Sequence, residues 1–134
     1  MRRIALVTLT TVALTGCGLN VQSPDLFLLT RTGQGKPLTL LVNDGGTVRC
    51  NGGKARQLPD QLLVQARSLA SDLNKDAKHK LRIPPARNTV ATYTIKLQDG
   101  TIRFPDTAAG SRHELAQVEL FTVQAAHQVC GLSG

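Results

Sequence analysis

The sequence predicts an α+β fold, a small two-layer sandwich in which two helices pack on one face of an antiparallel sheet. Short β-prone segments alternate with turns that contain Gly, Asp or Asn, which is typical of strands joined as hairpins. Two longer segments have apolar residues at helical spacing. The predicted order of elements is β-β-β-α-β-β-α, or β-β-α-β-β-α if the first turn is only a bend.

The chain begins with the pattern of a bacterial lipoprotein export signal. Two arginines precede an apolar segment, residues 4–14, and the lipobox Leu14-Thr15-Gly16-Cys17 ends it. The apolar segment is shorter than the roughly 20 residues of a transmembrane helix, which favours a signal that is removed. We therefore expect cleavage before Cys17 and a lipid on its thiol. An ordinary secretory signal and a retained membrane helix are the alternatives.

These expectations define the domain organisation and the location. Residues 1–16 are the predicted signal peptide, residues 17–25 a lipidated tether without periodicity, and residues 26–134 a single domain of ordinary size. Acyl chains on Cys17 would hold the protein on a membrane. We expect this to be the extracytoplasmic side of the cell membrane.

The net charge of the mature chain bears on its partners. Removal of the signal peptide takes away two of the 16 basic residues and none of the nine acidic ones, which leaves about +5. Such a charge attracts anionic headgroups or acidic partners over roughly a nanometre at physiological salt. Four aromatic residues are too few for the stacking platforms of single-stranded nucleic acid or carbohydrate sites, so we expect neither ligand.

The first part of the domain predicts three strands. Residues 26–30 are apolar and β-prone, and the glycines that follow them end the first strand. Residues 38–42 form the second, with Pro37 before it, where a missing N–H is tolerated. The turn Asn43-Asp44-Gly45-Gly46 accepts the positive φ of a tight hairpin, and residues 47–50 then return as the third strand.

The next segment has the helical period. Residues 60–73 place six Leu and Ala side chains in one apolar stripe. Pro59 suits the first turn of a helix, and Asp60 favours the positive end of the helix dipole. The sequence therefore predicts a helix that packs on the sheet through one face.

A second hairpin and a second helix complete the predicted domain. Residues 92–98 alternate between apolar and polar side chains, and residues 101–104 pair back after an Asp-Gly turn. The last helix begins near Ser111, because the spacing of Ser111 and Glu114 predicts a capping box. Gly131 is expected to end this helix.

Cys50 and Cys130 lie beyond the export signal, where thiols tend to oxidise, so an intramolecular disulfide is expected. It would close a loop of about 80 residues and stabilise the fold by roughly 4 kcal/mol through loop entropy. We expect it to join the middle of the sheet to the C-terminal end of the last helix. Two separate buried thiols are the alternative, and a redox-active pair is disfavoured because no Cys-x-x-Cys spacing occurs.

The spacing of chemically active residues predicts no catalytic site, metal site or cofactor. His113 and His127 share a helical face but lie about 21 Å apart along the helix, and His79 stands among basic residues. The acidic residues of the two helices have the spacing of helix-surface charges. No nucleophile elbow occurs, and Pro37 follows the one stretch that resembles a phosphate loop. We therefore expect a protein that is not an enzyme.

The most basic segment of the domain links the first helix to the second hairpin. Five cations occur there against one carboxylate, and two consecutive prolines favour an extended, semi-rigid chain. The segment is a candidate binding site for an envelope protein or another anionic partner. An ordinary solvated connection is the alternative interpretation. The five cations are Lys75, Lys78, Lys80, Arg82 and Arg87.

Several local features together resemble a known family. Leu58-Pro59 leads into a helix striped with Leu and Ala, and an Asp-Gly turn follows residues 93–97. With Phe104-Pro105-Asp106 and a last helix that carries leucines, the layout of residues 26–120 resembles that of emfourin-type inhibitors of thermolysin-like metalloproteases. The lipobox makes the chain similar to small lipoproteins of high-G+C bacteria. We expect a membrane-anchored, non-catalytic lipoprotein that binds a protein or anionic partner, and the emfourin resemblance implies protease inhibition as the alternative.

Overall fold

The structure, a computed structural model, describes residues 25–33 and 35–132 of the 134-residue chain. The predicted signal peptide, the lipobox with Cys17 and the tether up to residue 24 lie outside the described residues. The elements are β1 (Asp25–Gly33), β2 (Leu38–Asn43), β3 (Thr47–Cys50), β4 (Ala55–Gln57), α1 (Asp60–Lys78), β5 (Ala91–Leu97), β6 (Gly100–Pro105), the 3-10 helix η1 (Asp106–Gly110) and α2 (His113–Gln128).

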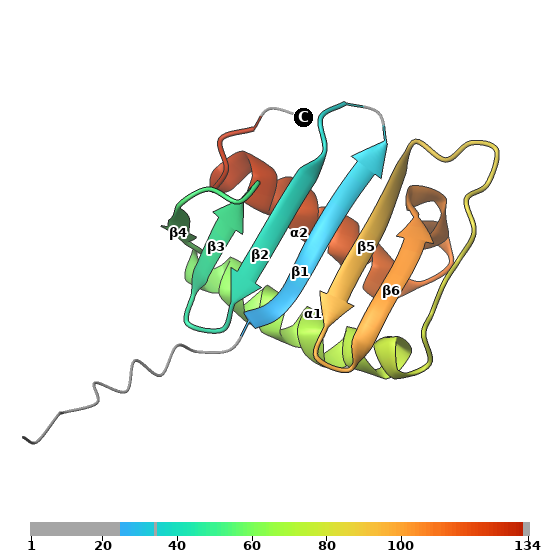
Figure 1. Cartoon of the computed structure of the whole chain (residues 1–134), viewed down its shortest axis with the longest axis horizontal. Coiled ribbons are helices and arrows are strands. Elements are labelled where there is room, and N and C mark those ends of the chain that lie inside the picture. Colours follow the sequence, from blue (N-terminus) through green and yellow to red (C-terminus); the bar gives the residue numbers. More distant parts are fainter. Residues whose placement is uncertain (1–24, 34, 133–134) are drawn as a thin grey trace, which may run out of the picture.

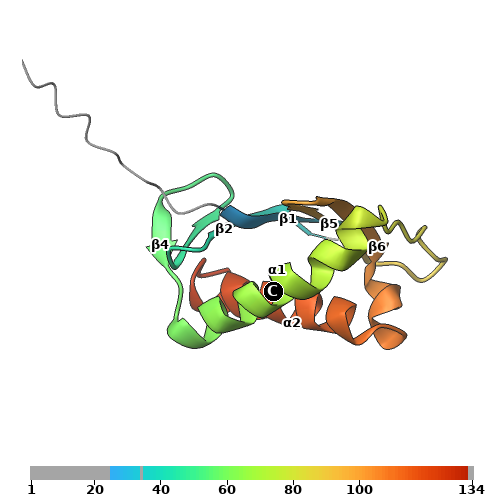
Figure 2. The ribbon, with the colours of Figure 1, turned by 90° about the horizontal axis from the view of Figure 1, so that it is seen from below.

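The described strands form one antiparallel sheet in the order β4-β3-β2-β1-β5-β6. Both α-helices pack on the same face of this sheet, as the side view shows (Figure 2). The predicted α+β two-layer sandwich is therefore confirmed. The first strand begins at Asp25, one residue before the expected start of the domain.

β4 is the element that the sequence analysis missed. Its three residues are all exposed and show no alternation, so no hydrophobic signal marks it. It exists because the backbone beyond β3 turns back through Asn51 and Gly52 and pairs with Thr47–Arg49. As a result β3 lies next to the outermost strand, and the disulfide joins this side of the sheet, not its middle, to the last helix.

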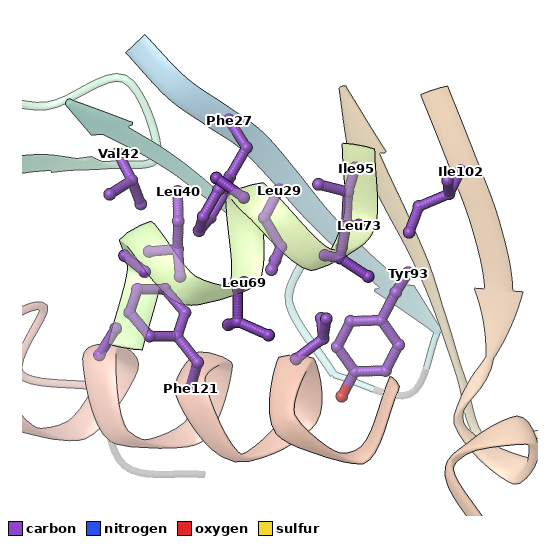
Figure 3. Packing of buried hydrophobic residues seen from close by; sticks show 14 of the residues in the cluster. Phe27, Leu29, Leu40, Val42, Leu69, Leu73, Tyr93, Ile95, Ile102 and Phe121 are labelled. Atoms are coloured by element: carbon purple, nitrogen blue, oxygen red, sulfur yellow. The ribbon is translucent and has the colours of Figure 1, made fainter. Parts of the chain in front are cut away.

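The core lies between the sheet and the helices and is mostly aliphatic (Figure 3). Tyr93 and Ile95 are buried on the inner face, which confirms the predicted alternation in this strand. Two aromatic contacts add to the packing. The ring centroids of Phe27 and Phe121 are 5.7 Å apart in an edge-to-face pair, and Tyr93 stacks on Phe104 at 5.2 Å.

α1 extends five residues beyond the predicted end and packs against the second hairpin. Ala77 is buried and packs on the turn between β5 and β6. Gly100 lies so close that a Cβ there would be 2.5 Å from the Ala77 carbonyl oxygen, and its φ is +151°. The extension therefore depends on tertiary contact with a glycine, a kind of contact that helical periodicity does not reveal.

The predicted capping box of α2 is wrong. The Ser111 hydroxyl donates to the Ala108 carbonyl oxygen at 3.1 Å, because η1 ends there, and Arg112 is the residue before the helix. The Glu114 carboxylate accepts from Arg112 and from its own backbone N–H, and not from the N–H of Ser111 as a capping box requires. The expected end of α2 is confirmed, since Gly131 adopts φ +65° just beyond it.

The expected disulfide between Cys50 and Cys130 is present, with Cα atoms 5.8 Å apart and a sequence separation of 80. The same corner has a second link, because the Arg56 guanidinium donates to the Val129 carbonyl oxygen at 3.1 Å. β3 and β4 are thus both tied to the C-terminal end of α2. One link is covalent and one is a charge-assisted hydrogen bond.

Candidate functional site

Hollows of similar size mark the described surface, and their lining residues distinguish them. One lies between α1 and α2 and has a volume of about 490 Å³. Another, about 480 Å³, lies where the end of α1 meets the β5–β6 hairpin. A third, also about 480 Å³, is formed by the start of α1 and the second half of α2, and four of its nine lining residues are glutamines.

The groove between α1 and α2 has mixed charge that is largely satisfied internally. Arg112 donates to Asp76 at 2.9 Å and to Glu114, so it links the two helices. The backbone N–H of Glu114 and the Arg112 guanidinium lower the pKa of the Glu114 carboxyl. Asp76 and Glu114, which the sequence suggests are separate helix-surface charges, thus share one cation. This arrangement fits a structural link between helices.

The hollow at the end of α1 is the more distinctive site, and we name it the basic cleft. Its lining contains four cations and a single carboxylate, Asp99, which gives a net charge of +3 at neutral pH. Two threonines, Thr94 and Thr101, add hydroxyl groups. The four cations are Lys78, Lys80, Arg82 and Arg103.

The backbone at the end of α1 directs the chain into the cleft. The N–H of Lys80 donates to the Ala77 carbonyl oxygen at 3.0 Å, and the N–H of Leu81 donates to the Asp76 carbonyl oxygen at 3.1 Å. This is the double hydrogen bond of a Schellman turn, in which Lys80 takes the left-handed position with φ +52°. The turn reverses the chain and sends the next residues along the outer edge of β6.

The connection then pairs with β6 through one isolated bridge. Arg103 N–H donates to the Leu81 carbonyl oxygen at 3.1 Å, and Ile83 N–H donates to the Arg103 carbonyl oxygen at 2.9 Å. Arg82 is consequently the parallel partner of Arg103. Partner residues in a bridge point to the same side of a sheet, so the two side chains lie next to each other.

The single carboxylate of the cleft neutralises little of its charge. Lys78 Nζ lies 3.7 Å from Asp99 Oδ2, and the Lys78 side chain is 67 % exposed. Such an exposed ion pair contributes little in water. Three cations of the lining, Lys80, Arg82 and Arg103, have no carboxylate of the cleft beside them.

Three of the five predicted site cations belong to the basic cleft, namely Lys78, Lys80 and Arg82. Lys75 lines the groove between the helices. Arg87 is exposed in the connection and does not line the cleft. The predicted segment therefore forms part of a cationic site, but its two ends lie elsewhere.

Arg103 is the site residue that the sequence analysis missed. The alternation of Ile102 and Phe104 places Arg103 on the face opposite the core, and that signal was available in the sequence. The alternation does not indicate which residue lies next to Arg103. The bridge to Arg82 depends on where the connection crosses the edge of β6.

The strand residues that line the cleft, Thr94, Thr101 and Arg103, alternate with buried residues and so lie on the face of the sheet opposite the core. The helices leave this face uncovered (Figure 2). Thr94 pairs with Arg103 and with Thr30, which places hydroxyls beside the arginine. In the neighbouring row Lys96 pairs with Thr101 and Leu28. Apart from Leu28, the residues of this face next to the cleft are therefore polar or cationic.

A buried acidic group lies away from the cleft. Oε1 of Glu119 is buried and has no hydrogen-bond partner among the described residues. Burial, and then the negative charge of Asp106, raise the pKa of Glu119 to about 6. Burial, and next the charge of Glu119, also raise the pKa of Tyr93. The expectation that Glu119 is an ordinary helix-surface charge is wrong, because α2 turns it partly inward.

Metal-ligating side chains do not gather within the described ranges, where no group of three His, Cys, Asp or Glu residues could hold an ion. His79 follows the end of α1, and His113 and His127 lie near opposite ends of α2. Within the same ranges no helix is long and apolar enough to cross a membrane. Comparison of the chain with protein-family models, curated proteins and solved structures finds no match in any of the three.

Proposed function

We propose that this protein is a lipid-anchored, non-catalytic domain of the bacterial cell envelope that binds an anionic partner through the basic cleft. The observation that carries the proposal is the convergence of Arg82 and Arg103 with two lysines around one hollow. Guanidinium groups bind carboxylates and phosphates through paired hydrogen bonds, and threonine hydroxyls can donate beside them. The ligand class is therefore an anion with two or more acceptor oxygens.

The anchoring part of the proposal rests on the lipobox at Cys17. The Cys50–Cys130 disulfide supports a location outside the cytoplasm, because such bonds persist in oxidising compartments. The non-catalytic part rests on the composition of the cleft. Its hydroxyl groups have no histidine beside them, and its carboxylate, Asp99, lies next to Lys78.

Two measurements test the two parts separately. Mass spectrometry of the protein isolated from membranes is expected to find Cys17 as an acylated first residue. Isothermal titration of the full-length protein with glycerol phosphate and with an acidic peptide is expected to show binding of at least one of these anions. Substitution of Lys80, Arg82 and Arg103 by Gln should abolish this binding.

A matched control distinguishes the loss of cleft contacts from the loss of overall positive charge. Lys36, Lys54 and Arg87 are exposed and do not line the cleft, so their substitution by Gln removes the same charge. This control should bind as the natural sequence does. Equal loss in both variants would contradict the cleft as the site. Stoichiometric inhibition of a thermolysin-like protease on mixing, with no anion binding, would favour the inhibitor alternative.

A further inference from the structure

We infer that the anion bound by the basic cleft is the phosphate-bearing headgroup layer of the membrane that holds Cys17, so that the cleft is a second membrane contact that orients the domain. The inference rests on the proposed function, because it requires both the lipid anchor and an anion-binding cleft. Three features support it: the position of the cleft relative to the start of β1, the length of the tether, and the chemistry of the cleft lining.

The end of α1 and the β5–β6 turn, which border the cleft, lie at the same end of the sheet as the start of β1 (Figure 1). β1 begins there at Asp25, and the register of Leu28 with Lys96 brings the β5–β6 turn to the same edge. β6 is the second strand over from β1, which is a lateral offset of about 10 Å. Gly100, the first residue of β6 after this turn, lines the cleft.

The length of the tether keeps this end close to a bilayer. Residues 17–24 span at most about 29 Å when fully extended, and less in any other conformation. Attraction between the cleft and anionic headgroups acts over about 8 Å at physiological salt. A tethered cleft therefore meets the membrane surface at a high effective concentration.

The acidic residues at this end of the sheet are mostly paired. Asp44 accepts from the Arg67 guanidinium at 2.7 Å, and Asp99 lies near Lys78. Asp25 accepts from the Asn43 side chain at 3.1 Å and keeps its negative charge. The charge that faces a membrane from the cleft is therefore positive, with one uncompensated carboxylate at the start of β1.

The lining of the cleft favours headgroups over an acidic protein. Protein interfaces depend on large buried anchors, usually aromatic residues. No aromatic residue lines the cleft, and its apolar members are Ala77 and Leu81. None of the large apolar side chains that are exposed among the described residues lines the cleft: three belong to the helices, and the other two lie just before β5 and beyond α2 (Val64, Leu120, Val123, Val90 and Leu132). Clusters of about four or more Lys and Arg residues close to a membrane anchor are typical of binding to anionic headgroups, and the cleft has four such cations.

The test uses the natural lipidated protein in lipid nanodiscs. Its readout is the rate of chemical acylation of the Lys78 and Lys80 amines, measured by mass spectrometry. We expect discs that contain phosphatidylglycerol to slow this rate several-fold relative to discs of phosphatidylcholine, with recovery at high salt. Arg82→Gln with Arg103→Gln keeps both reporter lysines. Each change should weaken binding to the phosphatidylglycerol surface about fivefold, so the double variant should lose most of the protection.

Controls separate this inference from the proposed function. Lys36→Gln with Lys54→Gln removes the same charge away from the cleft and should leave the protection intact. Arg82→Lys with Arg103→Lys should restore most of it. Protection by soluble glycerol phosphate or by an acidic peptide, with none from phosphatidylglycerol, would overturn the membrane assignment and leave the proposed function standing. Absence of protection by all of these anions would overturn both.

Discussion

Arg82 and Arg103 are partners in an isolated parallel bridge, which places two exposed cations from separate segments next to each other. Two backbone hydrogen bonds of 3.1 and 2.9 Å hold the connection against β6. Neither bond uses a side chain, so either arginine can be changed without loss of the bridge. The proposed ligand contacts can therefore be tested by substitution without the fold as a confounding factor.

Substitution of Lys80, which has a left-handed backbone conformation, by glycine should increase the stability of the protein. Lys80 has φ +52°, a conformation that costs a residue with a Cβ about 1–2 kcal/mol, whereas glycine adopts it freely. Part of this gain is offset, because glycine has more conformational entropy in the unfolded chain. Lys80→Gly should therefore raise the free energy of unfolding by about 0.5–1 kcal/mol. Urea denaturation measures this change. Lys80→Ala is the control and should give no gain.

The close approach of Gly100 to α1 predicts a loss of stability. A Cβ at this position would lie 2.5 Å from the Ala77 carbonyl oxygen, which is backbone and cannot rotate away. Gly100→Ala should therefore lower the free energy of unfolding by about 2–3 kcal/mol. Gly35→Ala is a matched control, because Gly35 also has a positive φ (+92°) and a Cβ there would meet nothing within 4 Å. Similar melting temperatures for both variants would contradict the proposed contact.

The disulfide is expected to contribute much of the stability of the domain. Substitution of both Cys50 and Cys130 by Ser should lower the free energy of unfolding by about 4–5 kcal/mol, because the open loop of 80 residues regains its entropy. Chemical denaturation of the oxidised protein and of the double variant gives the difference. A difference below about 1 kcal/mol would mean that the hydrogen bond from Arg56 and the core suffice to hold this corner.

The raised pKa of Glu119 should make the stability of the protein depend on pH. Its pKa of about 6 in the folded protein lies above the usual 4.5, so the folded state binds more protons than the unfolded state between these values. Stability from this group is therefore greatest below pH 4.5 and falls as the pH rises to about 6. Glu119→Gln should remove this fall and raise the free energy of unfolding at pH 7 by about 1 kcal/mol, after allowance for solvent screening.

Glu114→Gln provides the comparison, because its effect has the opposite sign. The pKa of Glu114 is lowered in the folded protein by its own backbone N–H and by Arg112, so its ionised form stabilises the fold above pH 4.5. Glu114→Gln should therefore destabilise the protein at pH 7. Denaturation series at pH 4, 5.5 and 7 measure both variants. Identical pH profiles for the natural protein and Glu119→Gln would show that Glu119 is solvated.

Periodicity along the chain was sufficient for the strands and helices that bury side chains. The alternation of Tyr93 and Ile95 and the stripe that includes Leu62 and Leu69 result from local burial, so each leaves a pattern in the sequence. The disulfide could be expected because two cysteines follow an export signal. The export signal and Cys17 remain predictions.

Only the tertiary structure decided β4, the last turn of α1 and the composition of the basic cleft. β4 is held by backbone pairing, and the last turn of α1 by contact with Gly100. Arg103 joins the cleft because the connection happens to cross the edge of β6 at Arg82. Exposed cations are not constrained by packing and show no periodicity in the sequence. Which of them become neighbours therefore depends on how the fold brings distant segments together.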